Sequence, residues 1–111
     1  MARRPVPEGS PLSLDRIIHG PLRLGVVTAL ATAGRRSFTE LRDALGATDG
    51  NLNASLQKLE QAGYVAAARK TEGRASFTEY QLTRAGQKAL ATYLEQLERI
   101  VGPLRDGRVG G

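Results

Sequence analysis

The chain has 111 residues, of which 41% are hydrophobic, and this is enough for one small domain with a single core. It contains no Cys and one His, so we expect no disulfide, no thiol nucleophile, no cofactor and no Cys/His metal site. Sixteen Lys and Arg residues against eleven Asp and Glu residues give a net charge of +5, which suits a polyanionic partner. The alternative is a basic domain whose charge serves only solubility.

No segment of the sequence predicts membrane insertion or secretion. The longest apolar run, Val26–Ala33, contains two Thr residues and is shorter than the roughly 18 residues that a membrane span requires. Arg3 and Arg4 are followed by prolines and not by an apolar segment. We therefore expect a cytoplasmic protein without a membrane partner.

The two ends of the chain differ in composition from the rest. Residues 1–11 hold three of the five prolines, which predicts a flexible basic arm. Residues 106–111 are rich in glycine and are predicted to form a disordered tail. One domain is expected between them, over residues 12–105.

The first part of this domain predicts two helices. The apolar segment Leu12–Ile18 favours a short N-terminal helix that ends before Gly20. Pro21 suits the first turn of a second helix, which is expected to run to about Ala33. Because apolar residues cover most of its circumference, this second helix is predicted to be central and buried.

Two short helices joined by a tight turn are predicted next. Ser37 and Glu40 have the spacing of a capping box, so a short helix is expected to follow Ser37. Thr48 is placed to cap another helix over residues 49–62, only a few residues later. This arrangement predicts a helix-turn-helix.

A β-hairpin and a long helix complete the domain. Residues 64–70 and 76–82 favour strands, and Gly73 lies between them. Thr83 is predicted to cap a last helix over residues 84–101. The fold class is therefore mainly α with a small β-hairpin: a winged helix-turn-helix with extra N- and C-terminal dimerisation helices.

Four stretches carry a resemblance to a known family: LDRIIHGPLRLGVVTAL, FTELRDALGATDGNLNASLQKLEQAGYV, RKTEGRA and EYQLTRAGQKAL. With them the chain resembles the winged-helix transcriptional regulators of the MarR and ArsR type, in particular small single-domain bacterial and archaeal members. The resemblance implies a homodimer that binds double-stranded DNA and usually represses transcription. The chain departs from the family at Ala54 and Ser55, where many relatives carry Arg, Lys or His.

The predicted second helix of the helix-turn-helix has one polar face. Projected at about 100 degrees per residue, its leucines point to one side. The N-terminal part of such a helix reads base edges in the major groove, so the candidate base-reading residues are Asn51, Asn53, Ala54 and Gln57. The alternative is a helix face that is simply solvated.

Further polar and basic residues are predicted to contact the DNA backbone or the minor groove. The hairpin tip and the segments around the two short helices provide them. They are Arg35, Arg36, Ser37, Thr39, Thr48, Lys58, Arg69, Lys70 and Arg74. The alternatives are a hairpin charged for solubility and arginines that stabilise the end of the preceding helix.

The last helix and the N-terminal segment have more apolar surface than one core uses, which predicts a two-fold dimer. The candidate dimerisation residues are Leu12, Leu14, Ile17, Ile18, Leu90, Tyr93, Leu94, Leu97, Ile100 and Val101. A dimer would favour a pseudo-palindromic operator. The alternative is that the two segments cover each other within one chain.

The single histidine, His19, has no Ser or Cys partner arranged near it in the sequence, so we expect a packing residue and no enzyme. Besides the DNA-binding repressor, two hypotheses stay open. One is a protein-interaction module that keeps the winged-helix shape. The other adds to the repressor a small apolar effector bound between the dimerisation helices and the DNA-binding core.

Overall fold

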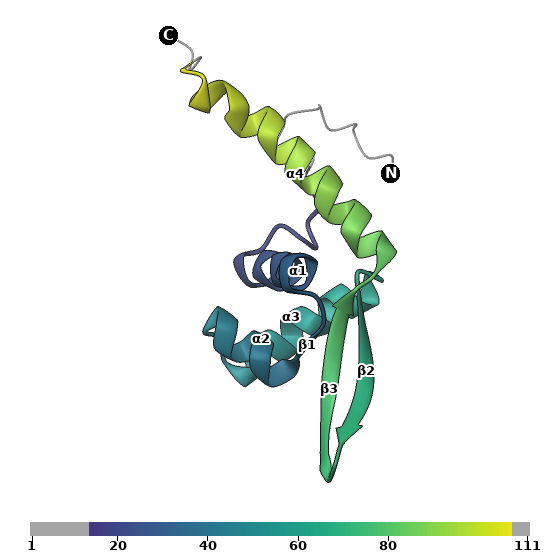
Figure 1. Ribbon diagram of the computed structural model, residues 1–111. Coiled ribbons are helices and arrows are strands. Elements are labelled where there is room, and N and C mark those ends of the chain that lie inside the picture. The colour runs from purple at the N-terminus through teal and green to yellow at the C-terminus, as the bar shows by residue number, and fades with distance from the viewer. Residues whose placement is uncertain (1–13, 108–111) are drawn as a thin grey trace, which may run out of the picture.

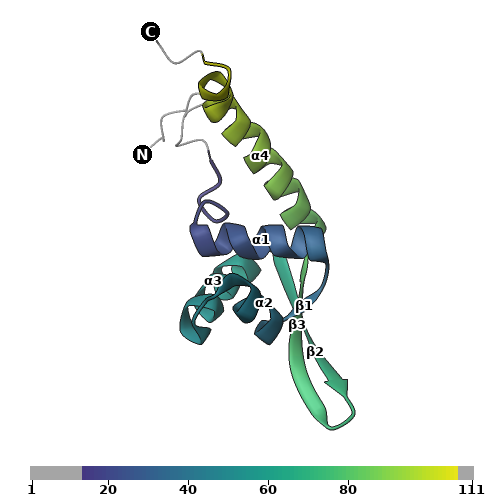
Figure 2. The same cartoon turned by 60° about the vertical axis from the view of Figure 1, so that its left-hand side comes forward.

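The computed structural model describes residues 14–107. Its elements are α1 (Pro21–Ala33), β1 (Arg36–Ser37), α2 (Phe38–Leu45), α3 (Asp49–Gln61), β2 (Val65–Glu72), β3 (Ala75–Leu82) and α4 (Arg84–Arg105). Helices α1 to α3 pack together, the β2–β3 hairpin projects away from them, and α4 extends in the opposite direction (Figure 1, Figure 2). The predicted fold class, a winged helix-turn-helix with mainly α structure, is confirmed.

The helices begin where the sequence predicts. Pro21 occupies the first turn of α1. Ser37, Thr48 and Thr83 cap α2, α3 and α4, and the side-chain oxygen of each accepts a hydrogen bond from the amide three residues later. Such a cap satisfies one of the amides that the first turn leaves without a partner.

A leucine stripe on α3 anchors the core. Leu52 and Leu59 are 0% exposed, and Leu56 is 1% exposed. They form one cluster with buried residues of α1, including Val26 and Val27. Burying a side chain of this size contributes about 1.5–3 kcal/mol, so the stripe determines which face of α3 points outward.

The sheet has three strands, whereas the sequence predicts only a hairpin. The strand order is β1-β3-β2, and the extra strand β1 pairs Arg36 with Tyr80 and Ser37 with Glu79. Two residues are too short to show an alternating pattern, which is why the sequence does not reveal them. The hairpin strands are also longer than predicted toward the tip, which they reach at Glu72 and Ala75.

Helix α4 continues beyond its predicted end at Val101 and passes through Pro103 to Arg105. A proline inside a helix lacks an amide donor and its ring crowds the preceding turn, but here the following turn still closes, with the Asp106 amide bonded to the Gly102 carbonyl at 3.0 Å. None of the helices in residues 14–107 combines the length and the apolar content that crossing a bilayer requires.

The predicted N-terminal helix is wrong over its described part: residues 14–20 form turns. The reason lies in Asp15, whose Oδ1 accepts hydrogen bonds from the amides of Ile17 at 2.8 Å and Ile18 at 3.3 Å. An aspartate that bonds its own neighbours in this way competes with helix formation. Leu12 and the predicted arm over residues 1–11 lie outside the described residues, as do residues 108–111 of the predicted tail.

Two tyrosines tie this turn to the rest of the domain. The Tyr64 hydroxyl donates to Asp15 Oδ2 at 2.5 Å, and the Tyr93 hydroxyl lies 2.9 Å from Nδ1 of His19. Leu14 and Ile18 pack with Tyr93 of α4 in a second buried cluster. The turn therefore joins α4 to the residue that precedes β2.

Helix α4 also approaches the backbone directly at Gly86. A Cβ atom at this position would lie 2.2 Å from the carbonyl oxygen of Tyr64, which accepts a hydrogen bond from the Thr83 amide at 3.0 Å. Only glycine permits this contact without a shift of the backbone.

We predict that Gly86→Ala lowers the free energy of unfolding by about 1–3 kcal/mol, the usual cost of overpacking. Gly50→Ala is the matched control, because nothing lies within 4 Å of a Cβ there and alanine favours the helix. Thermal unfolding measures both. A Gly86→Ala variant that melts at the wild-type temperature would contradict the contact.

Alkaline pH tests the bond between Tyr64 and Asp15. This bond, with a smaller contribution from burial, raises the pKa of Tyr64 from 10.0 to about 12. A raised pKa stabilises the folded state fully below about pH 10 and loses this effect as the pH rises through about 12. We therefore expect urea unfolding to show a steeper loss of stability between pH 10 and 12 for the wild type than for Tyr64→Phe; parallel curves would contradict the bond.

Candidate nucleic-acid interface

Helix α3 presents a polar face to solvent. Asn51, Asn53, Ala54 and Gln57 are all exposed, as the sequence predicts for base-reading residues. Ser55 is buried, with 8% of its surface exposed. Of the two departures from the family pattern, only Ala54 therefore lies on the surface that can meet a ligand.

The turn between α2 and α3 sets the position of this face. Gly46 adopts the left-handed conformation with φ 62°, and the Ala47 amide bonds back to the Arg42 carbonyl at 3.1 Å. Thr48 then starts α3, and its hydroxyl is occupied as an acceptor by the Asn51 amide at 3.2 Å. Its proton remains available to donate to a phosphate oxygen.

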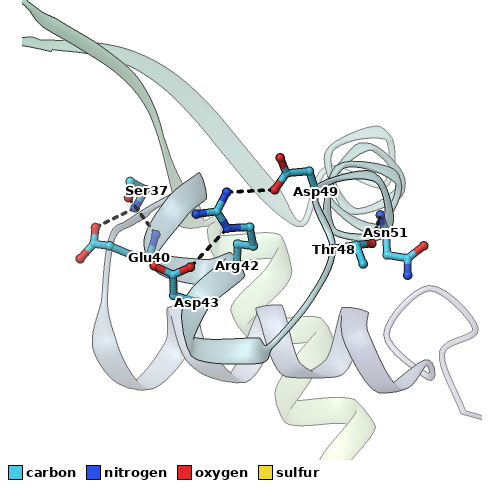
Figure 3. A network of polar contacts seen from close by, with 7 residues as sticks. All are labelled: Ser37, Glu40, Arg42, Asp43, Thr48, Asp49 and Asn51. Carbon is cyan, nitrogen blue, oxygen red and sulfur yellow. Dashed lines mark hydrogen bonds and ion pairs between the residues drawn. The ribbon is translucent and has the colours of Figure 1, made fainter.

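The start of α2 is a complete capping box (Figure 3). The Glu40 amide donates to the Ser37 hydroxyl at 3.1 Å, and the Ser37 amide donates to Glu40 Oε1 at 3.0 Å. The hydrogen bond from the Ser37 backbone amide has the largest effect on the pKa of Glu40 and the interaction with the Ser37 side chain the next largest, and both lower it. Two amides at this end of α2, those of Ser37 and Glu40, are therefore bonded within the box beside a negative carboxylate, and Thr39 remains exposed.

Arg42 is a site residue that sequence reasoning missed. Its Nη1 donates to Asp49 at 3.0 Å and its Nε to Asp43 at 3.2 Å (Figure 3). The hydrogen bond to Asp49 has the largest effect on the pKa of Arg42 and that to Asp43 the next largest, and both raise it. These exposed pairs add little stability, but Arg42 neutralises two carboxylates beside the polar face of α3. The sequence signal is a basic residue in α2 that is followed by one acidic residue directly and by another just after the turn.

The β2–β3 hairpin is the wing of this fold, and it carries the cations that the sequence predicts near its tip. Arg69 and Lys70 are neighbours in β2, so their side chains lie on opposite faces of the hairpin. Arg69 donates to Thr78 Oγ1 across the strands at 3.2 Å. Arg74 is exposed in the turn at the tip, beside Gly73. The tip lies far from α4 (Figure 1, Figure 2).

Arg35 lies at the base of the wing rather than beside α3. It lines a hollow of about 220 Å³ together with Lys70, Glu79 and the small side chains of residues 66–68. Arg36 lies next to it in β1, and its Nη1 donates to the Arg35 carbonyl at 2.6 Å. The structure therefore brings Arg35 and Lys70 together, whereas Lys58 lies on α3.

The candidate dimerisation residues divide into covered and exposed sets. The prediction that all of them face a partner is wrong for Leu14, Ile18, Leu90 and Tyr93, which are buried within one chain. Ile17, Leu97 and Ile100 are partly buried against the same clusters. The most exposed large apolar residues are Leu94 at 50% and, beyond the predicted set, Leu104 at 55%. With the half-buried Val101, the surface left for a partner lies on the C-terminal half of α4.

The family model described as a winged helix DNA-binding domain matches residues 22–101. The chain belongs to this family. This winged helix domain is 29% identical to an uncharacterized protein of Methanocaldococcus jannaschii over 86 residues, which cover 77% of this chain and 92% of the relative.

Solved structures show the same relationship. A transcriptional regulator homologue from Pyrococcus horikoshii OT3 matches with a TM-score of 0.76 and 26% identity, covering 81% of this chain and 89% of that one. A MarR family regulator from Neisseria meningitidis shares the fold, with a TM-score of 0.56 and 17% identity, covering 80% of this chain and 61% of that one. The predicted resemblance to winged-helix regulators is confirmed by the family model and by these structures. Within residues 14–107, no group of three or more acidic or histidine side chains is placed to hold a metal ion.

Acidic pH tests the capping box at the edge of the interface. A lowered pKa means that the ionised Glu40 stabilises the fold above about pH 4.5, and that this contribution is lost as the pH falls through its folded value. We expect Glu40→Gln, which keeps an acceptor without the charge, to lose less stability than the wild type on acidification below pH 4.5. Glu95→Gln on α4 is the control; equal acid profiles for wild type and Glu40→Gln would contradict the box.

Proposed function

We propose that this protein is a homodimeric repressor of transcription that binds a specific DNA sequence. The observation that carries the proposal is the division of α3 into a buried leucine face and an exposed amide face, beside a basic hairpin. A helix of this kind fits the major groove, and the hairpin fits the DNA backbone or the adjacent minor groove. The protein would act in the cytoplasm on double-stranded DNA.

The exposed amides supply the sequence preference in this proposal. Asn51, Asn53 and Gln57 carry the side chains that pair with adenine through two hydrogen bonds. Ala54 offers a methyl group that contacts the thymine methyl. Because α3 has no Arg on this face, the preferred half-site is expected to be rich in A·T pairs.

Charged and hydroxyl side chains supply affinity that does not depend on sequence. Cations that neutralise phosphates release counterions, so binding weakens as salt rises. The proposed contacts on the wing side of α3 are Arg35, Arg36, Arg69, Lys70 and Arg74, and those at the helix-turn-helix are Ser37, Thr39, Thr48 and Lys58.

The exposed end of α4 supports a second copy of the chain as the partner. Leu94, Val101 and Leu104 follow one another at intervals of seven and three residues along this part of α4. Such spacing places them on one side of a helix, where an identical helix can pack. A two-fold dimer places its recognition helices about 34 Å apart, one turn of DNA, and so favours an inverted repeat.

The decisive experiment is selection of bound sequences from random DNA with the full chain. We expect an enriched inverted repeat with half-sites one helical turn apart. Gln57→Ala should weaken binding by about 1–3 kcal/mol and relax the preference at one position of each half-site. Glu95→Ala, on the exposed surface of α4, is the control. A pool without enrichment at moderate salt would overturn the proposal.

A second candidate function rests on the exposed leucines of α4. With Leu94 and Leu104 half exposed, this winged helix could bind a different protein. A monomer in light scattering together with undetectable DNA binding would favour that function. A small apolar effector stays a prediction: Leu14, Ile18 and Tyr93 pack in the junction where it would enter, so it would have to displace them.

A further inference from the structure

A hollow of about 560 Å³ lies on the flank of α3 that faces the start of α1. It is lined by Arg16, Ile17, Arg23, Lys58, Gln61 and Ala62. Three of these six residues are cations, and none is acidic. Of the three, only Lys58 is among the DNA contacts predicted from the sequence.

The flank with this hollow is opposite the flank that faces the sheet. The walls of the hollow come from the turn over residues 14–20, from the start of α1 and from the C-terminal part of α3, and no residue of β2 or β3 lines it. Lys58 therefore lines α3 on the side of this turn, and not on the side of the sheet.

The two arginines reach this flank because the turn over residues 14–20 is fixed against α1. Arg23 Nε donates to the Ile17 carbonyl at 2.6 Å, and its Nη2 donates to the Arg16 carbonyl at 3.3 Å. Arg23 thereby holds the segment that carries the exposed side chain of Arg16. Within residues 14–107, no carboxylate forms an ion pair with Arg16, Arg23 or Lys58.

We propose that Arg16, Arg23 and Lys58 form a seat for a DNA backbone phosphate on the side of α3 away from the wing. This inference rests on the proposed function. A helix in the major groove, which is about 12 Å wide, lies between two phosphate chains. The wing serves one chain with Arg69 and Arg74, and the hollow serves the other.

The shape of the hollow favours a phosphate that belongs to a polymer over a free small molecule. Arg16, Lys58, Gln61 and Ala62 are all exposed, so an occupant stays open to solvent on one side. Sites for small ligands instead bury some 70–90% of the ligand surface. A backbone phosphate needs only charge and donors on one side, and three neighbouring cations provide both.

The test is the salt dependence of DNA binding by Arg16→Gln. Because the substitution is present in both chains of the dimer, Arg16→Gln should remove two phosphate contacts and lower the slope of log Kd against log salt by about 1.8, and Arg16→Gln/Lys58→Gln should lower it by about 3.6. The sequence preference of Arg16→Gln should stay that of the wild type. Lys88→Gln, which removes the same charge from the exposed surface of α4, should leave the slope unchanged. Circular dichroism melting verifies that each variant folds.

An Arg16→Gln slope equal to that of the wild type would overturn the seat while leaving the proposed function intact, provided that Gln57→Ala still relaxes the base preference. Absence of selective DNA binding by the wild type would overturn both. Titration with inorganic phosphate, followed through the amide signals of residues 16, 17 and 58, tests whether the hollow binds a free anion instead of the DNA backbone. Shifts there, combined with an unchanged slope, would mean a free-anion site and would also overturn the backbone assignment.

Discussion

The burial of the leucine stripe of α3 against α1 is the constraint on which the remaining structure depends. Leu52, Leu56 and Leu59 have at most 1% of their surface exposed, so α3 cannot rotate without bringing them into water. This fixes the opposite face, with Asn53 and Gln57, toward solvent. The core therefore holds the exposed amides in place. Because the buried leucines fix the position of α3, the side chains on its polar face are not needed for packing.

The sequence predicts those elements whose signals are local, and it fails where distant residues decide. Helix starts were predictable because a cap such as Thr48 acts within three residues. The outward face of α3 followed from helical periodicity alone. The two-residue strand β1 exists only because β3 lies beside it. In residues 14–20 the bonds from the Ile17 and Ile18 amides to Asp15 take the place of a helix, and the Asp15 carboxylate that accepts them is also bonded to Tyr64, which is 49 residues away. Arg42 was missed for the same reason, since its role depends on the approach of Asp49.

The short turn over residues 14–20 connects two parts of the domain that are distant in the sequence. It bonds to Tyr93 of α4 through His19 and to Tyr64, which follows α3, through Asp15. Ile18, at 0% exposure, packs against the same Tyr93. The turn therefore contacts both α4 and the residue that precedes β2 through buried or hydrogen-bonded side chains.

Under the proposed function, these contacts would also connect DNA binding with dimerisation. In a dimer formed through the exposed end of α4, the spacing between the two copies of α3 would depend on the angle between α4 and the packed helices α1 to α3. Contacts to the turn and the close approach at Gly86 set that angle. Arg16 lies in the same turn, so a phosphate bound there would be held by the element that fixes the spacing. Phosphate binding and half-site spacing would then be coupled, because a change in the position of α4 would move the phosphate seat relative to α3.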